Sequence, residues 1–363
     1  MSTNEIGVVY LARHADGITA FRRFARSYGQ LPAGVAHDLV VIYKGFNCAK
    51  DADAARAVFE GLSHIAISVP DVGFDIGAYA EASRRVSHEY LAFLNTHTEI
   101  LAPNWLSHLH AHAVRADTGA VGAMGSYESI RSTVLLLRAA IWSSIGVGKR
   151  YDRWLAHYFD FVLRQHHPNW YSPSGHVLEP VVTPPGWVAR LAGILARKYR
   201  RASFDAGGTA LIWRGAPPFD FMQFPAFPNP HLRTNGFMMR RERFLGLDLP
   251  STPSKFETSL FESGPDSMTA RLRARNLNVV VVGADGVAYG IADWWRSNTF
   301  RCGDQRNLLV ADNHTRAFAE MSPGGRATLA WTTWGSFRGR APEHFPDLGV
   351  PFPTATLGTV DVR

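Results

Sequence analysis

The feature that most constrains this chain is the regular alternation of short apolar runs and helical patterns through its N-terminal part. Each apolar run is rich in β-branched or aromatic residues and is followed by a polar turn. Consecutive parallel strands need a long crossover connection, so the alternation predicts an α/β fold with a mostly parallel sheet. The expected strands are residues 6–11, 38–43, 64–69, 90–94, 119–124, 209–213 and 278–283, and the expected helices are 18–28, 51–62, 77–87 and 267–275.

The composition predicts a globular protein that attracts anions. Of the 363 residues, 46% are hydrophobic and 19% are charged, which excludes a disordered tail or a coiled coil. The 38 basic residues outnumber the 31 acidic ones, and the net charge of +7 favours nucleotides or acidic surfaces as partners. The basic residues form no recognition motif for nucleic acid, so we expect no nucleic-acid partner.

Cysteine usage and hydropathy predict a cytoplasmic protein. The sequence has two cysteines, Cys48 and Cys302, which are too few for a disulfide framework and favour a reducing compartment. The N-terminal stretch lacks the pattern of an export signal. The most apolar run, residues 134–142, is short and interrupted by Arg138, so we expect no membrane span.

The character of the sequence changes near residue 129. Residues 130–165 and 187–201 have helical patterns and are joined by proline-rich connectors, which predicts a helical insertion over about 129–205. We expect it to interrupt one domain of residues 1–310. An irregular extension, residues 311–363 with one short helix near 315–321, is expected to pack on the same domain. The 187–201 helix has an apolar side and a basic end, a pattern shared by membrane-surface helices and ordinary amphipathic helices.

Polar residues follow several of the expected strands. In an open α/β sheet, ligands bind beyond the carboxyl ends of the strands. Arg13 follows the first strand, Asp75 follows the third, and the polar segment 95–99 follows the fourth. We therefore expect the ligand site at this edge of the sheet.

Several segments occur in an order that resembles the landmarks of glycosyltransferases of the GT-A fold. The resemblance is closest to family 2 and to rhamnan-synthesis-type transferases, and it covers about the first 300 residues. It implies a Rossmann-like sheet with helices on both faces, a nucleotide-sugar donor and a saccharide or glycolipid acceptor. It also implies inverting transfer in polysaccharide or cell-envelope glycan synthesis, with peripheral contact at the inner face of a membrane. The segments are GVVYLARH, GFDIGAYAEA, YLAFLNTHTEIL, GAVGAMGS, LRTNGFMMRRERF and FESGPDSMTARLRARNLNVVVVGADG.

The metal motif of that family is altered in this chain. The family has an Asp-x-Asp after the fourth strand, where this sequence has Asn95, Thr96 and His97. The resemblance leaves two alternatives open. His97 and Glu99 bind a divalent cation, Mn²⁺ or Mg²⁺, or His97 and basic side chains neutralise the donor diphosphate without a metal.

The resemblance also implies the residues that bind the donor. The nucleotide-sugar-binding residues that it implies are Arg13, Asp75, Asn95 and His97, and the charge of Arg296 makes that residue a further candidate for the diphosphate. A carboxylate such as Asp75 suits hydrogen bonds to sugar hydroxyls or to a base edge, and a guanidinium group such as Arg13 suits a diphosphate. The alternatives are that Asp75 caps a helix and that Arg13 is an ordinary surface arginine.

Inverting transfer needs a general base that deprotonates the acceptor hydroxyl. The resemblance places it near the start of a late helix, where Glu262 and Asp266 compete for the role. We favour Glu262, because helix capping and the helix dipole already explain an Asp at position 266. The alternative for Glu262 is a salt-bridged loop carboxylate.

The acceptor side is implied by two further segments. Arg233, Thr234 and Asn235 correspond to the acceptor-side segment of the family, and Trp294 and Trp295 offer rings that stack on sugars. His314 is expected to lie near the diphosphate. A buried tryptophan pair that stabilises the end of the sheet is the alternative for Trp294 and Trp295.

Two other functions remain open from the sequence. A catalytically degenerate member of the same fold would bind carbohydrate or act as a scaffold, and the altered metal motif keeps this alternative open. A nucleotidyltransferase would share the nucleotide-binding half. Such enzymes carry a glycine-rich, basic loop after the first strand, which the segment ARHADGITAF lacks.

Overall fold

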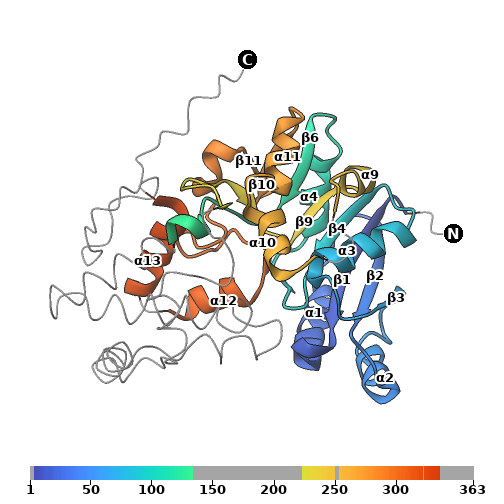
Figure 1. The fold of residues 1–363 in the computed structure, drawn as a ribbon. Helices are drawn as coiled ribbons and strands as arrows, with labels where there is room; N and C mark the ends of the chain where they lie inside the picture. Colours follow the sequence, from blue (N-terminus) through green and yellow to red (C-terminus); the bar gives the residue numbers. More distant parts are fainter. Residues whose placement is uncertain (1–3, 134–222, 250–252, 322, 336–363) are drawn as a thin grey trace, which may run out of the picture. The chain divides into compact units, whose positions relative to one another are not determined.

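The computed structural model describes residues 4–133, 223–249, 253–321 and 323–335, and Figure 1 shows their arrangement. The chain divides into two compact units. The first consists of Met1–Tyr127 and Pro230–Glu320, and the second of Glu128–Asn229 and Met321–Arg363. The expected insertion, about 129–205, and the expected strand at 209–213 lie almost entirely outside the described residues, as does the basic helix at 187–201.

The first unit is built on an eight-stranded, mostly parallel sheet, which confirms the α/β class. Its strand order is β11-β10-β6-β9-β4-β1-β2-β3. Only β9 and β11 run antiparallel to their neighbours in this sheet. The strands are β1 Ile6–Arg13, β2 Asp38–Lys44, β3 His64–Val69, β4 Tyr90–Leu94, β6 Thr118–Gly122, β9 Phe237–Arg240, β10 Asn278–Val282 and β11 Ala288–Tyr289.

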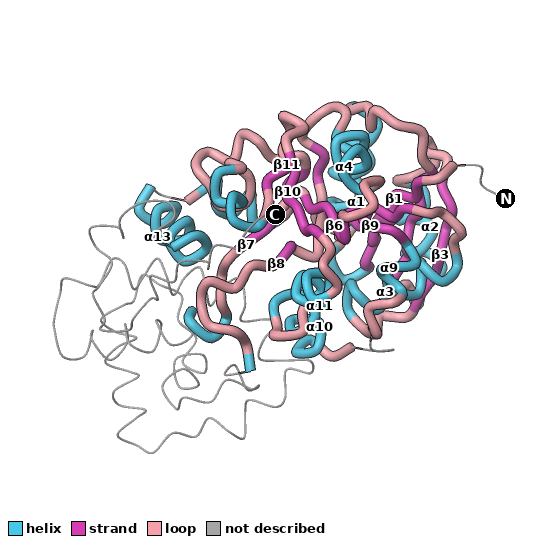
Figure 2. The backbone as a smooth tube through the Cα atoms, turned by 90° about the horizontal axis from the view of Figure 1, so that it is seen from above, coloured by secondary structure: helices cyan, strands magenta, loops and turns pink. Residues whose placement is uncertain are grey.

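Helices cover both faces of this sheet. Figure 2 shows α1 and α4 on one face and α3, α9 and α11 on the other. Three helices, α4, α9 and α10, were not expected from the sequence. The helices of the unit are α1 Ile18–Gln30, α2 Ala49–Ala57, α3 Phe74–Arg85, α4 Trp105–Ala113, α9 Arg241–Leu245, α10 Lys255–Ser263, α11 Met268–Ala274 and α12 Asn313–Glu320.

Several shorter elements lie outside the large sheet and its helices. The first unit also contains the 3-10 turns η1 His14–Asp16 and η4 Ile291–Arg296 and two small antiparallel pairs. In the second unit, α13 runs over Pro323–Trp334, so the expected irregular extension is helical here. The two antiparallel pairs of the first unit are β5 Glu99–Ile100 with β12 Val310–Ala311, and β7 Gly125–Ser126 with β8 His231–Leu232.

The core of the first unit forms around β1, whose residues Ile6–Ala12 are all buried. A strand covered on both faces must be apolar on both, which explains the continuous run IGVVYLA. The ring of Tyr10 stacks on Phe24 of α1 with centroids 3.7 Å apart. The same side of the sheet receives Leu109 of α4, which is fully buried in the core cluster. In the part of the chain that is described, no helix combines the length and apolar character needed to cross a membrane.

Truncating a leucine in this core should destabilise the protein strongly. We expect Leu109→Ala to lower the free energy of unfolding by about 2–5 kcal/mol, because it removes buried methyl groups and leaves a cavity. Leu101 is 45% exposed, so the matched change Leu101→Ala should alter it by less than about 0.5 kcal/mol. Chemical denaturation of both variants measures the difference. Equal losses would show that α4 does not pack as described.

Candidate functional site

The carboxyl ends of the parallel strands meet at one edge of the sheet in the first unit. Arg13 ends β1, Lys44 ends β2 and Asn95 follows β4. Because β9 runs antiparallel to β4, residues 233–236, which precede β9, reach the same edge. The site therefore combines strand ends with a segment from the second half of the chain.

A hydrogen-bonded turn joins the residues after β4 to Asn235, which is 140 positions from Asn95. Asn235 Oδ1 accepts hydrogen bonds from the Asn95 backbone N–H and from the Thr98 hydroxyl, each at 2.8 Å. Asn95 Oδ1 accepts one from the backbone N–H of His97 at 3.0 Å. Residues expected on the donor side and on the acceptor side are thus in direct contact.

Two carboxylates, Asp75 and Glu262, both contact Thr234. The Thr234 backbone N–H donates to Glu262 Oε1 at 3.3 Å, and its hydroxyl is 3.4 Å from Asp75 Oδ2. Arg233 Nη1 forms an ion pair with Glu262 Oε1 at 2.9 Å. The structure therefore brings together four of the residues expected in the site.

Local sequence explains where Glu262 lies. Ser254 caps α10 in a capping box, in which its hydroxyl accepts from the Glu257 N–H and its own N–H donates to the Glu257 carboxylate. The helix then runs to Ser263, so Glu262 belongs to its last turn. Glu262 is a helix residue and not the loop carboxylate considered from the sequence, although it does form an ion pair.

Asp75 lies in the first turn of α3, whose N-cap residue is Gly73. The alternative that Asp75 caps this helix is therefore wrong in detail, although Asp75 Oδ1 accepts from the neighbouring Ile76 N–H at 3.0 Å. Desolvation by the surrounding protein raises the pKa of the Asp75 carboxyl above its usual range. The charge of Lys255 opposes the rise in pKa, and the charge of Glu262 adds to it.

Arg233, the ion-pair partner of Glu262, lies near a second arginine. The guanidinium carbons of Arg233 and Arg301 lie 5.2 Å and 4.8 Å from the ring centroid of Phe300. Burial lowers the pKa of the His314 imidazole well below its usual range. The charges of Arg233 and Arg301, followed by those of Lys255 and His97, lower it further. His314 is thus a neutral group among cations at neutral pH.

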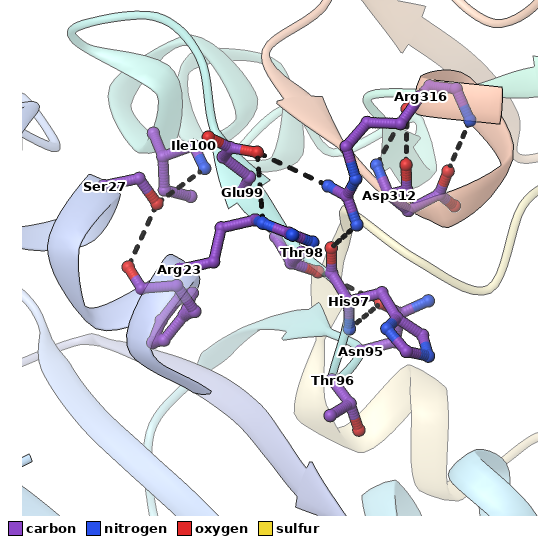
Figure 3. A network of polar contacts seen from close by, with 12 residues as sticks. Arg23, Ser27, Asn95, Thr96, His97, Thr98, Glu99, Ile100, Asp312 and Arg316 are labelled. Carbon is purple, nitrogen blue, oxygen red and sulfur yellow. Dashed lines mark hydrogen bonds and ion pairs between the residues drawn. The ribbon is translucent and has the colours of Figure 1, made fainter. Parts of the chain in front are cut away.

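The structure does not bring together His97 and Glu99, the expected metal ligands. Figure 3 shows the Glu99 carboxylate between Arg23 and Arg316, with the His97 ring on the other side of the segment. Glu99 Oε2 is 3.8 Å from Arg23 Nε and 3.4 Å from Arg316 Nη1. The His97 Nε2 atom instead lies 3.8 Å from Asp16 Oδ1. Glu99 therefore serves as the anion of an arginine pair.

Arg13 is tied to the loop that leads into α3, the helix of Asp75. Its Nε and Nη2 atoms donate to the two carboxylate oxygens of Asp71, each at 3.0 Å. Lys44 is buried beside them and donates to the backbone carbonyls of Val72, at 2.9 Å, and of Phe74. These contacts fix the loop between β3 and α3.

The remaining expected residues lie apart from the Thr234 contacts. Asp266 is exposed in the turn before Ser267, which is the N-cap residue of α11. On η4, Trp294 is fully buried and stacks on Tyr127, which agrees with the alternative of a buried tryptophan pair for this residue alone. Trp295 of the same turn is partly exposed.

The guanidinium group of Arg296 lies 4.8 Å from the Trp295 ring centroid and 3.3 Å from Asp293 Oδ1. The Arg296 side chain is 62% exposed.

Sequence reasoning missed several contributors to this edge. Lys44 ends a buried strand and Asp71 follows another, so the rule about carboxyl strand ends would have found both. Lys255 is the first residue of α10, whose capping box was present in the sequence as Ser254 and Glu257. Arg316 had no local signal, because its role depends on a contact with Glu99 from 217 positions away.

No protein-family model matches this chain, and a search of curated proteins finds no match.

The raised pKa of Asp75 predicts a pH-dependent gain of stability for Asp75→Asn. An unfolded Asp titrates near pH 3.9, so above that pH the native carboxylate costs stability. Below it both states are protonated and the cost vanishes. We expect the variant to melt at a higher temperature than wild type at neutral pH, with the gain disappearing as the pH falls to about 4.

Thermal unfolding across this pH range measures the effect, with Asp53→Asn as the matched control. Asp53 has a side chain that is 70% exposed, and its ion pair with Arg56 should contribute little. A loss of stability for Asp75→Asn at neutral pH would contradict the assignment of a desolvated carboxylate.

Proposed function

We propose that this chain is a nucleotide-sugar-dependent glycosyltransferase that transfers a sugar to a saccharide or glycolipid acceptor with inversion. The observation that carries the proposal is the meeting of Glu262 with Asp75, Thr234 and Arg233 at the carboxyl edge of the sheet. This edge is where ligands bind in open α/β sheets. The resemblance of the sequence to GT-A transferases gives the same reaction class.

In the proposed reaction, Glu262 is the general base. Its carboxylate takes the proton of the acceptor hydroxyl while the hydroxyl oxygen bonds to the anomeric carbon of the donor. The bond between that carbon and the diphosphate oxygen breaks on the opposite face, and its electron pair leaves with the nucleoside diphosphate. Arg233 and the Thr234 N–H hold the Glu262 carboxylate in place for this step.

Asp75 is suited to bind the donor sugar. Its contact with the Thr234 hydroxyl places it next to Glu262, and both of its oxygens can accept hydrogen bonds from sugar hydroxyls when it is ionised. We assign the base role to Glu262 rather than Asp266, because Asp266 is exposed and outside the Thr234 contacts.

The substitution Glu262→Gln tests this proposal. We expect transfer to fall by about 10²–10⁴-fold, because a general base contributes in the transition state, while nucleotide affinity stays close to that of wild type. The measurement is release of nucleoside diphosphate from a panel of sugar nucleotides with mixed saccharide acceptors, together with calorimetric binding of the nucleoside diphosphate.

The matched control is Asp266→Asn, which should retain full activity. If Asp266→Asn is inactive and Glu262→Gln is active, the base has been assigned wrongly. If wild type binds a nucleotide or a saccharide but turns over no donor, the alternative of a carbohydrate-binding or scaffolding protein replaces this proposal. Consumption of a nucleoside triphosphate with a sugar phosphate would instead indicate a nucleotidyltransferase.

A further inference from the structure

The segment after β4 does not fit a divalent cation. Asn95 Oδ1 accepts a hydrogen bond from within its own turn, from the His97 N–H at 3.0 Å, and lies 3.3 Å from the Thr98 hydroxyl oxygen. The Glu99 carboxylate is held by arginines and lies on the other side of the segment from the His97 ring (Figure 3). A magnesium or manganese ion bound to a diphosphate needs carboxylate oxygens directed at the phosphates, and these residues do not direct them there.

Two guanidinium groups instead lie near one aromatic ring beside the Glu262 ion pair. Arg233 and Arg301 both lie close to Phe300, and Arg301 is 2% exposed. A guanidinium group is always charged and binds phosphate oxygens in a planar, often bidentate geometry.

A second observation points to a polar ligand at this place. Asn235 is 3% exposed, and its Nδ2 group has no hydrogen-bond partner among the described residues. A buried donor without an acceptor destabilises the fold, so a ligand oxygen that accepts its hydrogen bond would be bound favourably. Asn235 follows Arg233 and Thr234 directly in the chain and contacts Asn95, which places this donor at the carboxyl edge of the sheet.

We propose that Arg233 and Arg301 neutralise the diphosphate of the donor and that the site binds a nucleoside diphosphate without a divalent cation. This inference rests on the proposed function. During transfer, negative charge grows on the departing diphosphate as the bond to the sugar breaks. Fixed guanidinium groups stabilise that charge in the role that a metal ion has in the family.

The experiment measures binding of UDP, GDP, ADP, CDP and dTDP to the full chain by calorimetry, in EDTA and then with Mn²⁺ or Mg²⁺. We expect at least one of them to bind with the same dissociation constant in all three conditions. Arg233→Gln and Arg301→Gln should each weaken its binding by about tenfold or more, since each removes a charge-assisted hydrogen bond. Because Arg233→Gln also leaves the Glu262 carboxylate without its ion-pair partner, the double variant Arg233→Gln/Glu262→Gln should show the same weakening of nucleotide binding.

The matched control is Arg306→Gln, because the Arg306 side chain is 80% exposed and close to Arg301 in sequence. Its affinity should equal that of wild type. If Arg301→Gln fails to fold, Arg233→Gln and the comparison of EDTA with metal decide the question.

Binding that requires Mn²⁺ or Mg²⁺ and disappears in EDTA would overturn the inference and leave the proposed function intact. Unchanged affinity in the folded arginine variants would also overturn it. Binding of none of the five nucleotides in any condition would instead overturn the proposed function.

Discussion

The pairing of β9 with β4 is the constraint on which the candidate site depends. Phe237 lies opposite Phe93 in this antiparallel ladder, and the Gly236 N–H donates to the Phe93 carbonyl at 2.9 Å. Gly236 has a φ of +68°, and a Cβ there would lie 2.7 Å from Val310, so glycine alone fits without strain. Because β9 runs against its neighbours, the chain arrives at the carboxyl edge just before it, and residues 233–235 are delivered to the end of β4.

Charged and titratable groups are concentrated at this edge, although burying them lowers the stability of the fold. Lys44 is buried, and its burial lowers the pKa of its ammonium group, which is held by Asp71 and by two backbone carbonyls. Desolvation raises the pKa of the Asp75 carboxyl, and burial among cations keeps His314 neutral. Groups with shifted pKa values cluster at functional sites. A bound ligand can supply the polar partners that such groups lack in the folded protein. The apolar core around β1 supplies the stability that permits it.

Several elements followed from local sequence and others did not. β3 and β4 occupy the residues expected, because each is a short apolar run between polar turns. α3 begins three residues earlier than expected, since Gly73 in a left-handed conformation provides its N-cap. α4 was missed because its three histidines obscure the apolar spacing of Trp105, Leu106 and Leu109, which are all fully buried. α10 carried a readable capping box, and its length places Glu262 in a helix.

The sequence by itself determined the α/β class and the strand ends, because both depend on the local period of apolar residues and on turns. It also identified the polar residues that follow those ends. Only the tertiary structure decided which of them meet. Glu99 faces Arg316 from 217 positions away, and Glu262 shares Thr234 with Asp75. Such contacts depend on the order of the strands and on how α10 and α12 pack. No local sequence pattern contains this information, because the direction of a side chain is fixed only when the elements pack together.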